Sequence, residues 1–177
     1  LTDAERTSAF LETMIGLDPA GVGADGERFY RCSQDHHDIV VHQAAEPGLK
    51  RAGWEVEDER NLDLAFEHFT REGLSPQTVD KAVTDALAIG RAFRVREPTT
   101  GVQFEYYSRV RQTIVPFRKA VTKIQRLGHF VVLAPEWEKS VESFTRLFNF
   151  RMSDQVGEMT ALLRAWRPVR RSLRRQG

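Results

Sequence analysis

Apolar and polar positions alternate in short blocks along this chain. From Phe130 to Leu133 the residues are aromatic, β-branched or aliphatic, a composition that favours an extended strand. The next block, from Glu136 to Phe148, has apolar residues three and four positions apart, the spacing of one helix face. These residues are Trp137, Val141, Phe144 and Phe148. The pattern predicts a strand that leads into a helix, with the imidazole of His129 at the start of the strand.

The first forty residues predict a helix followed by a hairpin. Asp3 is a suitable helix cap and Gly16 a suitable stop. The expected apolar stripe between them is Ala9, Phe10, Met14 and Ile15. After a glycine-rich turn at 21–26, residues 28–32 and 38–42 are typical of two short strands. The polar turn that joins these strands contains His36 and His37.

The same order returns from Leu49, this time with an opening strand. Residues 49–56 are strand-like, and Asp58 is expected to cap a helix that ends at Gly73. A second short helix is expected over 78–89. Two further strands, 91–95 and 101–108, then flank a turn from Pro98 to Gly101. Strand, helix and short strands therefore recur at intervals of roughly fifty residues.

Three copies of one βαβββ repeat account for this order, the first without its opening strand. Because one such repeat curls its sheet into only half of a barrel, two must lie side by side to bury its faces. We therefore predict an α+β fold of repeated βαβββ units that form cradle or barrel domains. Residues 1–109 would form an amino-terminal domain, 110–126 a connector, 127–166 a partial carboxy-terminal domain and 167–177 a basic tail.

Composition limits the class of protein. With 177 residues, 41% of them hydrophobic, the chain can bury a core, and its formal net charge is only +1. Five arginines crowd the tail at 167–177, but no aromatic residues alternate with them, so we expect no nucleic-acid partner. No apolar run approaches the ~20 residues of a membrane helix. Cys32 is the single cysteine, which favours a reducing compartment, and we expect a cytoplasmic protein.

Five stretches of the chain carry a resemblance to a known family: 1–17, 30–42, 48–58, 96–107 and 126–135. In this order they resemble the two-domain extradiol catechol dioxygenases of the vicinal oxygen chelate superfamily, which also includes glyoxalases and bleomycin resistance proteins. The resemblance implies four repeats in two domains and a metal, Fe(II) or alternatively Mn(II), in the second domain. It implies a catecholic substrate that O₂ opens, and a metal ligand at His129. The family's amino-terminal domain carries no metal, so His36 and His37 are expected to be polar turn residues.

The sequence departs from the family pattern after Trp166. The resemblance implies a second histidine and a glutamate from a fourth repeat, where this sequence has its arginine-rich tail. Arginine cannot replace histidine, because a guanidinium stays protonated and has no lone pair for a cation. The corresponding place in the second repeat holds Arg51. Glu105 lies where other members of the fold keep a carboxylate, and it is expected to be a solvated strand residue.

The sequence therefore shows one of the three ligands that a facial triad of two imidazoles and a carboxylate needs to hold Fe(II). Three hypotheses stay open. The sequence is an incomplete part of an extradiol dioxygenase, a non-catalytic binding or dimerisation module of the same fold, or a truncated gene product. No catalytic residue besides the metal ligand is assigned.

The third repeat also predicts association. Its inner sheet face would be open to solvent, and an open apolar face of this kind favours self-association. The residues expected on this face are Phe130, Val132, Leu162 and Trp166. We therefore expect a homo-oligomer formed at least partly through residues 127–166.

Overall fold

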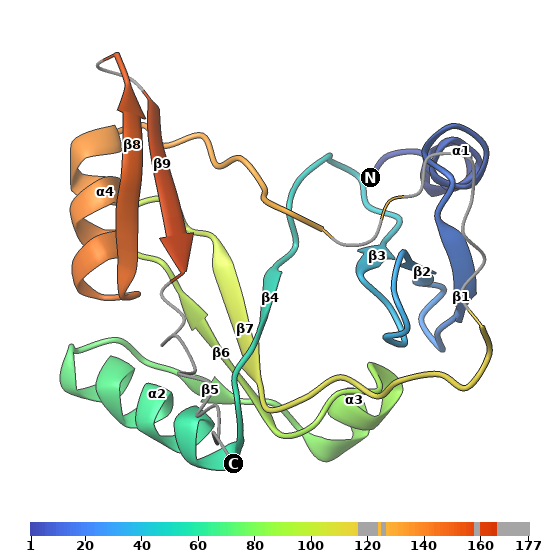
Figure 1. Ribbon diagram of the computed structural model, residues 1–177, viewed down its shortest axis with the longest axis horizontal. Helices are drawn as coiled ribbons and strands as arrows, with labels where there is room; N and C mark the ends of the chain where they lie inside the picture. The colour runs from blue at the N-terminus through green and yellow to red at the C-terminus, as the bar shows by residue number, and fades with distance from the viewer. Residues whose placement is uncertain (117–123, 125–126, 158–159, 166–177) are drawn as a thin grey trace, which may run out of the picture. The chain divides into compact units, whose positions relative to one another are not determined.

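The computed structural model describes residues 1–116, 124, 127–157 and 160–165 (Figure 1). Its chain forms two compact units. The first unit consists of Leu1–Arg96 and Val102–Val131, and the second of Glu97–Gly101 together with the chain from Val132 onward. Within the described residues, no helix has the length and apolar character that crossing a membrane requires.

The first repeat is a helix followed by an antiparallel three-stranded sheet. Helix α1 (Ala4–Phe10) continues into a π-helical turn, η1 (Leu11–Ile15), that ends at Gly16 with a positive φ of 79°. Strands β1 (Asp18–Val22), β2 (Arg28–Arg31) and β3 (Ile39–Val41) follow, in the order β1-β2-β3. The two predicted strands are confirmed. Strand β1 was missed because proline and glycine weaken its strand signal, and both are tolerated on this irregular edge strand.

Of the apolar stripe predicted for the first helix, Ile15 packs against the core, but the prediction is wrong for Phe10 and Met14. Phe10 is 51% exposed and Met14 is 67% exposed, whereas Ala4 and Ser8 are buried. Ser8 can be buried because its hydroxyl donates a hydrogen bond of 2.6 Å to the carbonyl oxygen of Ala4. The helix therefore uses a different face, and the core beneath it consists of Ala4, Leu17, Tyr30, Cys32 and Val41, with Leu11 and Ile15 packed against it.

The second repeat is a complete βαβββ unit. Its elements are β4 (Ala52–Glu55), α2 (Glu59–Arg71), β5 (Gln77–Thr78), α3 (Lys81–Ala86), β6 (Ala92–Arg96) and β7 (Gln103–Tyr107). The strand order is β4-β7-β6-β5, with β4 parallel to β7 (Figure 1). Asp58 caps α2 as predicted, because its carboxylate accepts a hydrogen bond of 2.8 Å from the amide of Asn61. The two-residue β5 was missed, and the predicted helix begins three residues later than expected.

Aromatic rings pack α2 onto one face of this sheet. The ring of Phe69 lies 6.0 Å from that of Phe93 and 5.4 Å from that of Tyr106, between centroids. Since side chains alternate along a strand, the neighbours of Phe93 in β6 and of Tyr106 in β7 point to the opposite face of the sheet. Tyr107 lies on that face beside Gly53, where a Cβ atom would approach the tyrosine ring to 3.2 Å.

The second unit contains the third repeat. Helix α4 (Trp137–Arg146) precedes the antiparallel strands β8 (Phe150–Val156) and β9 (Thr160–Ala165). The ring of Phe144 packs 5.9 Å from Phe148 and 5.8 Å from Phe150, which confirms the predicted helix and holds it against β8. Gly157 has a positive φ of 61° at the predicted turn after β8.

The predicted strand at 130–133 is wrong for this structure, because residues 127–134 belong to no strand. In the second repeat, the opening strand β4 pairs with the last strand β7. The corresponding last strand of the third repeat would come after β9, where Trp166 and the predicted tail at 167–177 lie outside the described residues. The predicted boundaries at 110, 127 and 167 stay predictions.

Candidate functional site

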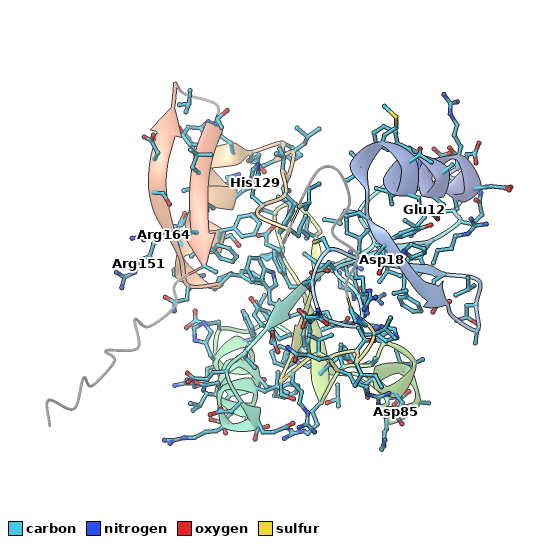
Figure 2. All side chains as sticks on the ribbon, turned by 45° about the vertical axis from the view of Figure 1, so that its right-hand side comes forward. Glu12, Asp18, Asp85, His129, Arg151 and Arg164 are labelled. Carbon is cyan, nitrogen blue, oxygen red and sulfur yellow. The ribbon has the colours of Figure 1, made fainter. Side chains whose placement is uncertain are left out.

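His129 lies on the irregular segment that precedes α4, and its side chain is exposed (Figure 2). The neighbouring Phe130 contacts two aromatic residues of the second repeat, with ring centroids 6.4 Å from Trp54 and 6.5 Å from Phe104. Phe130 was predicted to face an open sheet of the third repeat, and these contacts place it elsewhere. The predicted metal ligand is therefore solvent-accessible, next to a residue that is 36% exposed and touches two aromatic rings.

A complete metal site is not formed by the residues that the structure describes. Among them, no three or more histidine, cysteine, aspartate and glutamate side chains gather as a metal would require. A facial Fe(II) site needs two imidazoles and a carboxylate on one side of the metal. His129 can supply one imidazole of such a set.

Glu105 is buried and charge-paired, so its predicted role as a solvated strand residue is wrong. Its exposed fraction is 4%. Its two carboxylate oxygens accept hydrogen bonds from Nε of Arg51, at 3.1 Å, and from Nε of Arg94, at 2.6 Å. Arg94 is the direct cross-strand partner of Glu105, and Arg51 precedes the adjacent strand β4. At the place where the family pattern would allow a histidine, this chain has a guanidinium that neutralises the carboxylate.

His36 and His37 lie together in the connection between β2 and β3. Their Nδ1 atoms are 3.0 Å apart, and both rings pack against Phe29 at 5.3 and 5.0 Å between centroids. Burial, together with the adjacent His36, lowers the pKa of His37 to about 4. The pair is therefore neutral near pH 7, with one Nδ1 donating to the other. These contacts make the histidines packed turn residues rather than members of a described metal cluster.

A cleft of about 950 Å³ opens in the first unit between α2 and the turn that follows α3. Arg91 extends along it, with Nη1 donating to Glu59 at 2.9 Å and Nη2 donating to Asp63 at 2.7 Å. Ser108 also donates to Glu59, at 2.7 Å. These groups satisfy one another, and the cleft presents no activated nucleophile or base.

Glu97 is a buried acidic residue that sequence reasoning missed. It occupies the turn between β6 and β7, and its exposed fraction is 0%. Its oxygens accept hydrogen bonds from the amides of Thr99 and Thr100 and from the hydroxyl of Ser143 on α4. Burial raises the pKa of this carboxyl, but the hydrogen bonds from Ser143 and Thr100 outweigh burial, so the pKa lies below its ordinary value.

Known proteins similar to this chain are aromatic ring-cleaving dioxygenases. The chain is 26% identical over 163 residues to the biphenyl-2,3-diol 1,2-dioxygenase of Paraburkholderia xenovorans strain LB400, covering 88% of this chain and 54% of that protein. It is 26% identical over 157 residues to a 1,2-dihydroxynaphthalene dioxygenase of Pseudomonas putida, covering 84% and 51%. The chain thus spans about half the length of these relatives. No family model matches it.

Solved structures with the same fold include a catechol dioxygenase and a glyoxalase. The halotolerant catechol dioxygenase BphC matches with a TM-score of 0.79 at 17% identity, over 87% of this chain and 53% of that chain. The Mn(II)-bound glyoxalase of Novosphingobium aromaticivorans matches with a TM-score of 0.70 at 21% identity, over 92% and 54%. The predicted α+β fold of βαβββ repeats is confirmed. The chain resembles extradiol dioxygenases in sequence and shares their fold.

Proposed function

We propose that this chain is part of an extradiol ring-cleaving dioxygenase and comprises its amino-terminal domain and the beginning of its metal-binding domain. The observation that carries the proposal is the sequence likeness to enzymes named biphenyl-2,3-diol 1,2-dioxygenase, which extends over 88% of the chain. By this likeness the substrate is an aromatic compound with two neighbouring hydroxyl groups, and O₂ is the second substrate.

In this proposal His129 supplies one imidazole to a divalent metal, Fe(II) or alternatively Mn(II). Two features of the chain support this role. The imidazole is exposed and precedes α4 by a short segment, and Phe130 is packed against Trp54 and Phe104, which limits where the histidine can lie. The remaining ligands would come from outside the described residues. When bound, such a metal holds the diol and O₂ together.

The first two repeats, in the same proposal, are a non-catalytic support. Arg51 neutralises Glu105 at the position where a metal could otherwise be held, and the histidine pair of the first repeat is packed against Phe29. These contacts also favour the second candidate function, in which the whole chain is a binding or dimerisation module. Leu162, at 48% exposed, leaves an apolar side chain on β9 for the predicted homo-oligomer through residues 127–166.

A cytoplasmic location remains part of the proposal. Cys32 is buried, and burial raises the pKa of its thiol to about 12, so the cysteine is an inert core residue. It therefore needs no oxidising compartment for its structural role.

Oxygen uptake tests the proposal directly. The protein that carries this chain would be loaded anaerobically with Fe(II) or Mn(II), then mixed with biphenyl-2,3-diol or 1,2-dihydroxynaphthalene in aerated buffer. We expect one O₂ consumed per diol and a ring-opened product whose mass equals that of the diol plus both oxygen atoms. His129→Ala is expected to abolish turnover, because a ligand of the metal is lost.

His42→Ala is the matched control, since His42 lies in the first repeat, where its Nδ1 is 3.3 Å from the amine of Lys50. It should retain activity. A wild-type protein that neither binds these metals nor consumes O₂ with either diol would favour the non-catalytic module. Sedimentation equilibrium would then test self-association, and a monomer at micromolar concentration would count against the dimerisation function.

A further inference from the structure

The second unit is built from two separate stretches of chain, and Glu97 is the residue at which they are joined. Residues Glu97–Gly101 form the turn between β6 and β7, yet they belong to the unit that contains α4. A carboxylate here is completely buried, whereas burying an ionised group is costly unless it is hydrogen-bonded. The groups that stabilise this charge therefore indicate which parts of the chain the turn holds together.

Five donors from three residues surround the carboxylate. Oε1 accepts from the amide of Thr99, at 3.1 Å, and from the hydroxyl of Ser143, at 2.5 Å. Oε2 accepts from the amide and hydroxyl of Thr100, at 2.6 and 2.5 Å. The hydroxyl of Thr99 lies 2.9 Å from both oxygens. An ionised carboxylate is an acceptor only and has about four lone-pair sites, so this environment of N–H and O–H donors favours the charged form.

Helix α4 has two serines, rather than apolar residues, on the buried face that lies beside this carboxylate. Ser140 and Ser143 are both buried on the face that also carries Phe144. Ser143 donates to Glu97, and the hydroxyl of Ser140 lies 2.7 Å from that of Thr99. Serine is a poor choice for the buried face of a helix unless its hydroxyl has a partner. Ser143 donates to Glu97 in the turn, whereas Ser140 accepts from Thr99 in the turn and donates to the carbonyl oxygen of Glu136, at 3.0 Å.

We propose that Glu97 is an anionic latch, in which its carboxylate fixes α4, and the hairpin of β8 and β9 packed on α4, to the turn at 97–101. The turn closes on itself through a hydrogen bond of 2.9 Å from the amide of Gly101 to the carbonyl oxygen of Glu97. Because this backbone hydrogen bond already closes the turn, the carboxylate of Glu97 can also accept a hydrogen bond from Ser143 of α4. Phe144 of the same helix contacts Phe150, so α4 in turn holds β8.

The simpler alternative is that Glu97 only stabilises its own turn. Glu97→Gln separates the two possibilities. Each carboxylate oxygen faces one backbone N–H, so either orientation of the glutamine amide places its NH₂ group against a donor. If the carboxylate fixes α4, this unfavourable contact between two donors should speed amide exchange in α4. If the carboxylate only stabilises its own turn, the contact should speed exchange in β6 and β7 instead.

Amide hydrogen exchange measures both regions in one experiment. For Glu97→Gln we expect the amides of α4 to exchange roughly 10-fold or more faster than in the wild type, while β6 and β7 change much less. Glu138→Gln is the matched control, because it removes the same charge from an exposed position in the first turn of the same helix. It should leave exchange in α4 nearly unchanged.

Ser143→Ala keeps the proposal testable even if Glu97→Gln does not fold. It removes the donor of α4 and leaves the bonds within the turn intact, and alanine favours the helix. Faster exchange in α4 supports the latch. Unchanged exchange in α4, or equal loosening of β6, β7 and α4 in Glu97→Gln, overturns it. Because neither metal nor substrate is present, a failure here is distinguishable from a failure of the proposed enzymatic function.

Discussion

Two buried carboxylates lie eight residues apart along one hairpin, and their charges are stabilised in opposite ways. Glu105, on β7 in the first unit, is held between the guanidinium groups of Arg51 and Arg94. Glu97, in the turn that belongs to the second unit, is held by hydroxyl and amide groups that carry no net charge. Both residues are less than 5% exposed.

The two sites differ in the groups that would be left without a partner if the carboxylate were removed. Around Glu105, two positive charges would stay behind in a largely buried place, at side-chain exposures of 13% for Arg51 and 26% for Arg94. Around Glu97, only neutral donors would stay behind, and hydroxyls can turn toward other acceptors. An uncompensated buried charge costs more than an unsatisfied neutral donor.

The largest expected effect is therefore that of Glu105→Gln. We expect the free energy of unfolding to fall by about 3–5 kcal/mol, the usual cost of breaking a buried ion pair on one side. Urea denaturation followed by tryptophan fluorescence would measure it. A loss below about 1 kcal/mol would mean that the two arginines find water or other partners easily.

Acid should reveal the second carboxylate. The folded-state pKa of Glu97 lies below the value of 4.5 that an unperturbed glutamate has, so the folded state binds its proton less readily than the unfolded state. Its contribution to stability is therefore present above about pH 4.5 and is lost as the pH falls through the folded pKa. Denaturation midpoints between pH 7 and pH 3 should fall less steeply for Glu97→Gln than for the wild type. Equal slopes would contradict the lowered pKa.

Neither environment could be predicted from local sequence. Arg51, the partner of Glu105 just before β4, is 54 positions away, and Ser143, the partner of Glu97 in α4, is 46 positions away. In a strand pattern, Glu105 has the same appearance as a solvated residue, and Glu97 the same appearance as any acidic residue before a proline turn. Periodicity in the sequence indicates which face of an element is apolar. It does not indicate that a polar residue has hydrogen-bond donors on another element.

Local signals did predict most of the elements. The Asp58 cap, the turn closed by Gly101 and the alternation in β6 and β7 all act within a few residues, so they are legible in one stretch of chain. The opposite holds for residues 130–133, whose apolar composition predicts a strand. A strand needs a partner to pair with, and composition alone does not supply one.

A smaller effect is expected from the helix side of the second carboxylate. Ser143→Ala removes one of five donors from Glu97 and should lower the free energy of unfolding by about 0.5–1.5 kcal/mol. Removing an arginine from Glu105 should cost more, because it leaves a buried charge with half its compensation. Arg51→Ala, measured by the same urea titration, provides that comparison. Equal losses in the two variants would remove the distinction between the charged and the neutral environments.

The smallest effect concerns backbone strain, for which each unit has a non-glycine residue with a positive φ. Ala88 has a φ of 53° in the first unit and Asn149 a φ of 55° in the second. Alanine is strained in this conformation, whereas asparagine tolerates it. Ala88→Gly should therefore stabilise the protein by roughly 0.5 kcal/mol, after the entropy of the added glycine is subtracted, and Asn149→Gly should have almost no effect. Thermal unfolding of both variants measures the difference. If Asn149→Gly stabilised the protein as much as Ala88→Gly, the two turns would be strained alike. The loss of the buried methyl group of Ala88 would then have offset part of the strain that Ala88→Gly relieves.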